Sequence, residues 1–108
     1  MTKIVEVLLL HGASVYAENH ERHTPLICAL HNKSFNICQL LLQHEADPNF
    51  DNGKPLRDAQ MIERFNVQFM RLLLQHGANP NTKDEELDCT ALHLAVAGAA
   101  ISSKKHFY

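Results

Sequence analysis

Apolar residues recur along the chain with a nearly constant period. Three leucine-rich runs each lead into a histidine that is followed two residues later by an alanine. The histidines are His11, His44 and His76, separated by 33 and 32 positions. A fixed period of this length is typical of a solenoid, in which each repeated unit buries its apolar face only against its neighbours. The pattern therefore predicts a stacked array that presents a binding surface.

Each leucine-rich run predicts one helix per copy of the repeat, which we call the outer helix. These helices are expected over residues 4–10, 35–43 and 67–75. In the middle copy, the apolar residues follow the i, i+3, i+4, i+7 spacing of a single buried helix face; they are Phe35, Ile37, Cys38, Leu41 and Leu42. A left-handed residue commonly stops a helix, and Gly12 and Gly77 stand at that place, where the middle copy has Glu45.

A second helix in each unit, the inner helix, is expected near residues 25–33, 55–63 and 91–101. Thr24 precedes Pro25, and this order suits a helix start. The threonine hydroxyl can cap free backbone N–H groups, and the N–H that proline lacks at the first helical position would have no partner within the helix. Lys54-Pro55-Leu56 keeps the proline and loses the cap. Small residues, Ala29, Ala59 and Ala95, would let the inner helices approach their neighbours closely and make the stack curve.

The middle unit departs from the others in two loops. Residues 50–54 form a shorter connection than residues 16–24, so a stunted loop is expected there. Residues 59–72 span two positions more than the equivalent residues 29–40, which indicates either a lengthened helix or an extended turn between the helices.

These motifs resemble those of the ankyrin repeat family. The resemblance rests on Thr24-Pro25-Leu26 with Ala29, on residues 90–95, and on residues 72–81, and it covers roughly residues 4–100. It implies an all-α solenoid of stacked helix-turn-helix units with protruding hairpin-like loops. We expect an array over residues 1–101, consisting of a partial unit, two full units and a partial unit, and a tail over residues 102–108.

The resemblance also implies a function, namely a non-catalytic module that binds a protein partner as part of a larger scaffold or adaptor. The partner would contact the concave surface made by loop tips and inner helices. Transferring the family's contact positions to this chain gives His20, Glu21, His23, His31, Asn32, Asp51, Asn52, Lys54, Glu86, Leu87 and Cys89. These residues are mostly polar, and few aromatic side chains beyond Tyr16 and Phe50 lie near them, so weak binding is expected from this segment alone.

The array is predicted to begin on an outer helix and to stop on an inner helix. Terminal repeats normally carry a polar outer face, whereas apolar residues are expected to be exposed at both ends here. These residues are Ile4, Val5, Leu8 and Leu9 at one end and Leu92, Leu94 and Val96 at the other. One hypothesis is therefore a fragment or truncated isoform without independent activity, which could self-associate through its uncapped ends.

In ankyrin repeats, asparagines in the loop after the outer helix can be substrates of an asparaginyl hydroxylase. Asn49 and Asn81 occupy that place. The alternative interpretation is that both side chains stabilise the turn by hydrogen bonds, as asparagine commonly does in loops.

Charge and cysteine content narrow the remaining classes. Ten basic and twelve acidic residues give a net charge of −2, too balanced to indicate a nucleic acid or an anionic membrane as partner. The first apolar run is too short to span a bilayer and has no small-residue cleavage site. Three cysteines without a Cys-x-x-Cys pair indicate no disulfide framework. An intracellular location, cytoplasmic or nuclear, is expected.

An enzyme is the remotest hypothesis. The sequence contains no phosphate loop, nucleophile elbow or His-Glu-x-x-His pair, and no cofactor is expected. A metal site could be imagined from residues close in sequence, namely His20, His23, Cys28 and His31, although their spacing is not that of known sites.

Residues 84–88 form an acidic fingertip, interpreted as a solvated loop or as a contact for a basic partner segment. Cys89 beside it lacks a neighbouring base.

Overall fold

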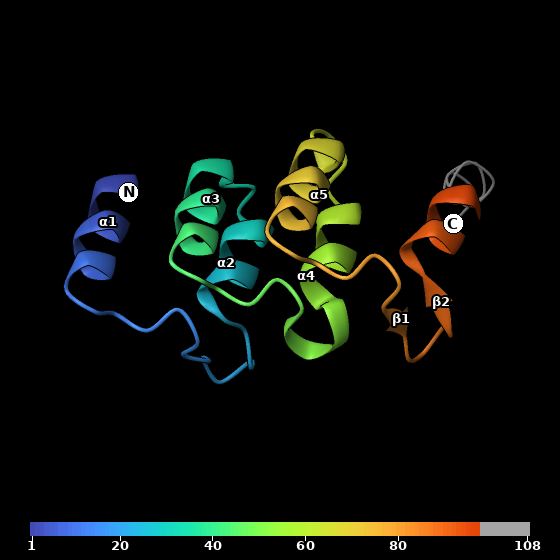
Figure 1. Ribbon diagram of the computed structural model, residues 1–108, viewed down its shortest axis with the longest axis horizontal. Helices are drawn as coiled ribbons and strands as arrows, with labels where there is room; N and C mark the ends of the chain where they lie inside the picture. The colour runs from blue at the N-terminus through green and yellow to red at the C-terminus, as the bar shows by residue number, and fades with distance from the viewer. Residues whose placement is uncertain (98–108) are drawn as a thin grey trace.

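A computed structural model of the chain describes residues 1–97, and it shows an array of paired helices (Figure 1). The elements are α1 (Thr2–Leu10), α2 (Pro25–His31), α3 (Phe35–Gln43), α4 (Phe50–Gln60), α5 (Asn66–Gln75), β1 (Lys83–Asp84) and β2 (Cys89–Thr90), followed by helical residues 91–97. The outer helices α1, α3 and α5 stand in a row, and the inner helices α2 and α4 pack beside α3 and α5. The predicted helix-turn-helix units are confirmed.

The three outer helices end in the same way, with two hydrogen bonds that close the last turn. In α3, the N–H of Glu45 donates to the carbonyl of Leu42 at 3.0 Å, and the N–H of Ala46 donates to that of Leu41 at 2.9 Å. This pair of bonds requires a left-handed residue after the cap. The residues at this place have φ of 86° at Gly12, 69° at Glu45 and 96° at Gly77. The predicted helix stops are confirmed, and Glu45 adopts the conformation that favours glycine.

The inner helix α2 starts as predicted and ends earlier. The Oγ1 atom of Thr24 accepts a hydrogen bond from the N–H of Ile27 at 3.5 Å, and Pro25 occupies the first helical position. The helix ends at His31 rather than near residue 33, because Lys33 is left-handed with a φ of 57°. The N–H of Ser34 then donates to the carbonyl of Ala29 at 2.9 Å and closes the turn.

The middle unit contains the two irregularities that the sequence indicated. The segment expected to be a short loop lies within the N-terminal part of α4. There Asp51, Asn52 and Gly53 form a left-handed turn, with φ between 52° and 82°, before the regular helix begins. The two extra residues lie in the turn between α4 and α5, where Phe65 has a φ of 57°. Of the two alternatives, an extended inter-helix turn is therefore correct, and α4 ends at Gln60 instead of residue 63.

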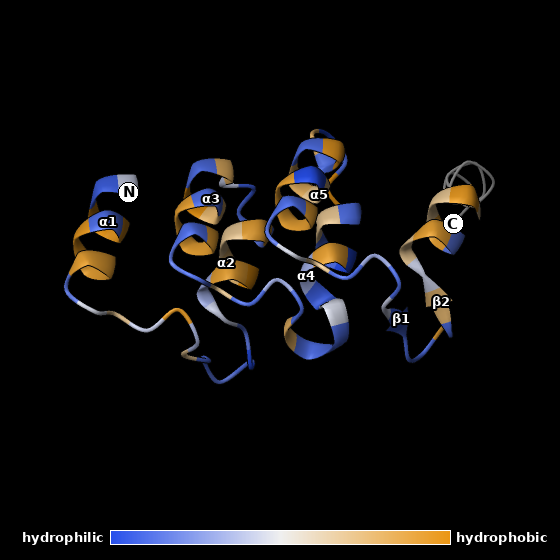
Figure 2. Ribbon diagram, viewed as in Figure 1, coloured by the Kyte–Doolittle hydropathy of each residue, from blue (hydrophilic) through white to orange (hydrophobic). Residues whose placement is uncertain are grey.

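The apolar core lies between α2, α3, α4 and α5 (Figure 2). Leu26, Ile27, Leu30, Cys38 and Leu73 are almost fully buried. The rings of Phe35 and Phe69 meet edge to face with centroids 5.4 Å apart and join α3 to α5. Residues of α1 contribute to this core only at its border, because none of them is buried.

Three loops project from the same side of the array (Figure 1), and we call them finger 1 (residues 16–24), finger 2 (residues 49–54) and finger 3 (residues 83–90). Finger 3 is a hairpin in which Lys83 pairs with Thr90 and Asp84 with Cys89. Finger 1 is a turn stabilised by the side-chain oxygen of Asn19, which accepts from the N–H groups of Glu21 and His23.

In the described part of the chain, no helix is long and apolar enough to cross a membrane. The predicted end of the last inner helix at residue 101 and the tail over residues 102–108 lie outside the described residues.

Candidate functional site

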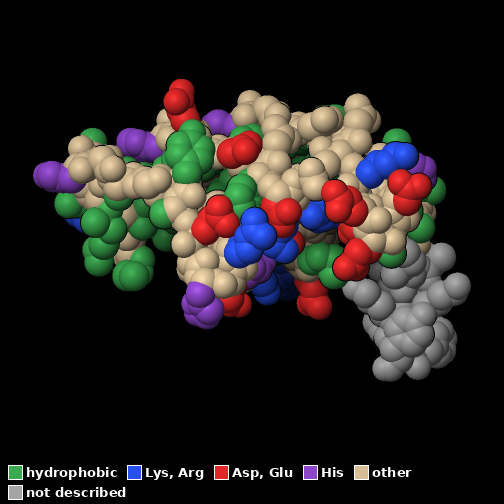
Figure 3. All heavy atoms as spheres, turned by 90° about the horizontal axis from the view of Figure 1, so that it is seen from below, with side chains coloured by type: hydrophobic (Ala, Val, Ile, Leu, Met, Phe, Trp, Pro, Cys, Tyr) green, Lys and Arg blue, Asp and Glu red, His purple; other side chains and the backbone are tan. Residues whose placement is uncertain are grey.

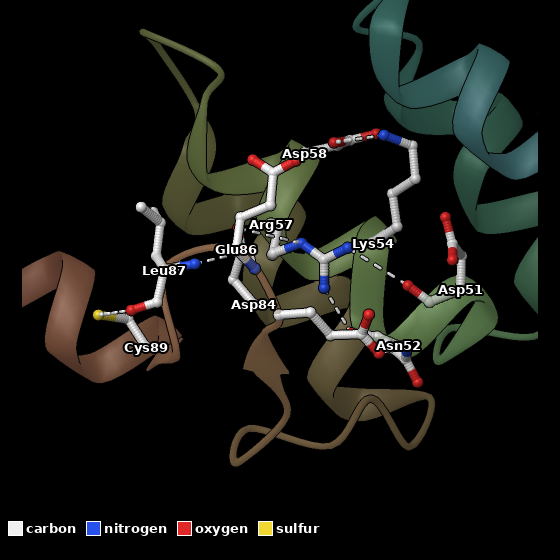
Figure 4. Close-up of polar contacts among 10 residues, drawn as sticks. Asp51, Asn52, Lys54, Arg57, Asp58, Asp84, Glu86, Leu87 and Cys89 are labelled. Carbon is white, nitrogen blue, oxygen red and sulfur yellow. Dashed lines mark hydrogen bonds and ion pairs between the residues drawn. The ribbon is translucent and has the colours of Figure 1, made fainter.

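A polar network centred on Arg57 joins finger 2 to finger 3 (Figure 4). The guanidinium of Arg57 donates to the backbone carbonyls of Asn52 and Asp51, the second at 3.3 Å. Its Nε atom lies 3.8 Å from Oδ2 of Asp84 on β1. The side chain of Asn52 donates to Oε1 of Glu85 at 2.7 Å. These contacts fix the distance between two neighbouring fingers.

Asp58 is the centre of a second set of polar contacts, which lies between the inner helices α2 and α4. Its Oδ2 atom lies 2.9 Å from Nε2 of His31 on α2, and its Oδ1 atom lies 3.5 Å from Nζ of Lys54, one helical turn earlier on α4. The side chain of Asp58 is largely buried, with 16% exposed. A buried carboxylate is tolerated when it is hydrogen-bonded and paired. Asp58 thus joins α2 to the first turn of α4 after finger 2, separately from the contacts that Arg57 makes with fingers 2 and 3.

The tip of finger 3 is shaped by Asp84. Its Oδ1 atom accepts hydrogen bonds from the N–H of Glu86 at 2.9 Å and from that of Leu87 at 3.4 Å. The thiol of Cys89 donates to the carbonyl of Leu87 at 3.2 Å. These bonds hold the backbone of the tip, while the side chain of Leu87 stays 58% exposed.

A cleft of about 880 Å³ lies between α4 and the segment that contains finger 3 and residues 91–97. Two cations, Lys54 and Arg57, line it together with five carboxylates: Asp51, Asp58, Asp84, Glu85 and Glu86. Its apolar lining consists of Met61, Val67, Met70, Leu87, Leu94 and Ala95. Seen from the side of the fingers (Figure 3), acidic and basic side chains gather over the middle of the array. The cleft thus combines negative charge with apolar surface.

A model of ankyrin repeats, present in three copies, matches residues 1–84. The chain belongs to the ankyrin repeat family. Ankyrin repeats are generally non-catalytic modules for protein–protein interaction. A comparison with curated proteins found no match to this chain.

The structure distributes the predicted contact residues of this ankyrin array over two areas. Asp51, Asn52, Lys54, Glu86, Leu87 and Cys89 belong to fingers 2 and 3, and all except Cys89 line the cleft. His20, Glu21, His23, His31 and Asn32 lie on finger 1 and α2, where the rings of His23 and His31 meet edge to face at 5.1 Å.

Sequence reasoning missed Arg57 and Asp58, and it named Asp84 and Glu85 only as part of the acidic fingertip of residues 84–88. The spacing of Lys54 and Asp58, four positions apart on one helix, was a usable signal for a contact between those two residues. Nothing in the local sequence showed that Arg57 would reach Asp84, because that contact depends on how one unit stacks on the next.

Three of the histidines form hydrogen bonds within the array. The rings of His11 and His76 form hydrogen bonds of 2.9 Å with the carbonyls of Val7 and Leu72, four residues earlier on their own helices. His31 is bonded to Asp58. Among residues 1–97, no group of three or more histidines, cysteines or carboxylates is placed to hold a metal ion.

The thiols differ in their surroundings. Cys38 is fully buried, and burial raises the pKa of its thiol to about 12, so that the nucleophilic thiolate does not form near neutral pH. Cys28 and Cys89 are partly exposed, and all three cysteines are free.

The asparagines predicted as hydroxylation sites are both exposed. The N–H of Asn49 donates to Oδ1 of Asp47 at 2.8 Å, and the N–H of Asn81 donates to Oδ1 of Asn79 at 2.9 Å. The two loops therefore share one turn, which the residue two positions earlier stabilises. Hydroxylation of either side chain stays a prediction.

Proposed function

We propose that this chain is the binding part of a larger scaffold or adaptor, and that its cleft takes a partner segment in which lysine or arginine residues flank one apolar side chain. The observation that carries the proposal is the composition of the cleft, in which five carboxylates and only two cations surround an apolar lining. Potentials of opposite sign at an interface favour the correct partner and speed its approach.

The two cations of the cleft are already engaged within the chain. Lys54 pairs with Asp58, and Arg57 pairs with Asp84. Within residues 1–97, no lysine or arginine lies within ion-pair distance of Asp51, Glu85 or Glu86. These three carboxylates would therefore face a basic partner.

Apolar contact would supply most of the affinity. Ion pairs at an exposed rim contribute little, about 0–1 kcal/mol each, whereas a buried apolar anchor contributes about 0.8 kcal/mol per methylene group. Leu87 at the tip of finger 3 and Met70 on α5 offer such contacts. The charges would select the partner, and the anchor would hold it.

The walls of the cleft are held in place before binding. Arg57 fixes the backbone of finger 2 and Asp84 fixes the tip of finger 3, so a partner would not have to order these loops. A surface that is already ordered loses less conformational entropy on binding.

A selection from random peptides displayed on phage, with the full chain as bait, tests the proposal. Enriched peptides should carry lysine or arginine on both sides of an apolar residue, and their binding should weaken as the salt concentration rises. A variant with Glu86→Lys and Leu87→Ser should lose them, whereas Glu63→Lys, an exposed charge change outside the cleft lining, should retain them.

Three results would contradict the proposal: enrichment of acidic or neutral peptides, equal binding by the cleft variant, or no enrichment at all.

For the location of the chain, we propose the inside of the cell, in keeping with three free cysteines.

A further inference from the structure

Asn52 is the only asparagine of the chain that is followed by a glycine, Gly53. The pair lies on finger 2, where both residues are left-handed, with φ of 55° and 82°. Glycine takes this conformation readily, and asparagine is among the few other residues that tolerate it. A larger residue has no room at position 53, since a β-carbon there would lie 2.8 Å from Cγ2 of Thr82. The shape of finger 2 therefore favours an Asn-Gly pair.

The side chain of an asparagine before glycine can react with the backbone, because glycine has no side chain that shields its nitrogen. The nitrogen of Gly53 loses its proton to a solvent base and bonds to Cγ of Asn52, whose side-chain nitrogen leaves as ammonia. Water then opens the five-membered imide. Cleavage of the new Cγ–N bond gives aspartate, and cleavage of the original C–N bond gives isoaspartate. The net reaction takes up one water and releases one ammonia.

Three hydrogen bonds oppose this reaction in the folded chain (Figure 4). The N–H of Gly53, which must lose its proton, donates to the carbonyl of Asn49 at 3.2 Å. The side chain of Asn52 donates to Oε1 of Glu85 on finger 3 at 2.7 Å, and its backbone carbonyl accepts from Arg57. Asn52 is thus held at its side chain and at its backbone. The rotation that brings Cγ to the backbone nitrogen therefore requires the contact between fingers 2 and 3 to open.

The product of the reaction is incompatible with this contact. A carboxylate only accepts hydrogen bonds, and Glu85 receives the Nδ2 donor of Asn52. After the reaction a second carboxylate would stand in the place of that donor, and two like charges so close together repel each other. Isoaspartate would also add one carbon to the backbone of a turn in which Gly53 already lies against Thr82.

We propose that Asn52 is a site of spontaneous deamidation, that the contact between fingers 2 and 3 controls its rate, and that the product keeps the two fingers apart. Opening of the contact starts the reaction, and the reaction makes the opening permanent. The site needs no enzyme, and water is its only co-reactant. The proposal does not depend on what the cleft binds.

Mass spectrometry of the full chain, incubated in mildly alkaline buffer and then digested, measures the reaction as a gain of one mass unit at Asn52. The same chain unfolded in guanidinium chloride gives the rate without the contact, which should be the faster one. Glu85→Ala and Arg57→Ala should each speed the reaction of the folded chain by about five- to tenfold, because each removes a hydrogen bond that holds Asn52. Circular dichroism checks that both variants keep their helices.

Glu86→Ala is the matched control, since it removes the same charge one residue away and leaves the bond between Asn52 and Glu85 in place. The two test variants also remove charges of opposite sign. A field effect alone would speed the reaction in Glu85→Ala, because a nearby carboxylate hinders loss of the proton, and would slow it in Arg57→Ala. Faster reaction in both variants therefore supports control by the contact.

Four results would overturn this control: opposite shifts in the two test variants, an equal gain in Glu86→Ala, equal rates in the folded and unfolded wild type, or no product at Asn52 in the unfolded chain. Hydrogen exchange tests the effect of the product. In Asn52→Asp, the amides of finger 3 should exchange faster than in the wild type, while those of finger 1 keep their rates. Unchanged exchange in finger 3 would show that the product does not separate the fingers.

Discussion

Asn49 holds the loop that contains Asn79, because its Oδ1 atom accepts the backbone N–H of Asn79 at 2.6 Å. Its Nδ2 atom donates to the carbonyl of Gly77 at 3.0 Å. One side chain thus satisfies two backbone groups of the next unit. Asn81 lies at the same place in its own loop. Within residues 1–97, its side chain forms no such hydrogen bond, and only its backbone N–H is bonded, to Asn79.

We therefore expect Asn49→Ala to lower the free energy of unfolding by about 1–2 kcal/mol, because two backbone groups lose their partner. Asn81→Ala should change it by less than about 0.5 kcal/mol, as surface substitutions commonly do. Urea denaturation of both variants measures the difference. Equal losses of stability would show that the hydrogen bonds from Asn49 to the next loop contribute nothing to the free energy of unfolding.

Glu45→Gly should stabilise the protein. Glu45 has a φ of 69°, which is costly for a residue with a β-carbon, by about 1 kcal/mol. The exposed carbonyl of Glu45 accepts the hydroxyl of Tyr16 at 2.7 Å, and this backbone contact remains after the substitution. The melting temperature should rise by a few degrees, since about 1 kcal/mol corresponds to roughly 4–8 °C in a domain of this size. An unchanged or lower melting temperature contradicts the strain argument.

Gly53→Ala should destabilise the protein more than Gly77→Ala. Both glycines have positive φ, of 82° and 96°, so both substitutions introduce backbone strain. A β-carbon at position 53 would also lie 2.8 Å from Cγ2 and 2.9 Å from Cβ of Thr82, whereas nothing lies within 4 Å at position 77. We expect a loss of about 1 kcal/mol for Gly77→Ala from strain alone, and a further 1–3 kcal/mol, roughly, for the clash at Gly53. Chemical denaturation compares the two, and equal losses would mean that the loop of Thr82 moves away without cost.

Burial of Cys38 predicts a loss of stability at alkaline pH. The pKa of its thiol is raised from 9.0 to about 12 in the folded state, so only the unfolded state releases the proton between these values. Below pH 9 the thiol is neutral in both states and has no effect. Above it, the thiol of the unfolded state ionises, and the free energy of unfolding falls by up to about 1.4 kcal/mol per pH unit until the folded thiol also ionises.

The measurement compares the wild type with Cys38→Ala between pH 8 and pH 11, so that the titration of other groups cancels. The alanine variant should be less stable at pH 8 because of the cavity, by about 1–2 kcal/mol. The difference in free energy of unfolding between the wild type and the alanine variant should become smaller as the pH rises. A gap that stays constant would show that the thiol ionises equally in both states.

The sequence by itself determined the repeat, the places of the helices and the positions at which the outer helices end. These features depend on interactions between residues a few positions apart, such as the capping of Ile27 by Thr24 and the left-handed stops at Gly12 and Gly77. Hydrogen bonds that close within one turn leave a pattern that can be read along the chain. The fold could be predicted for this reason.

The tertiary structure alone decided how successive units touch. The contact between Arg57 and Asp84 joins residues 27 positions apart, and that between Asn49 and Asn79 joins residues 30 positions apart. Their geometry depends on the spacing of stacked units, which the local sequence pattern does not specify. The cleft arises between units rather than within one, so its composition becomes visible only when the units are stacked. The phase of the repeat predicts that Leu8 and Leu92 are exposed, and the fraction of each that is exposed depends on which helices pack beside it.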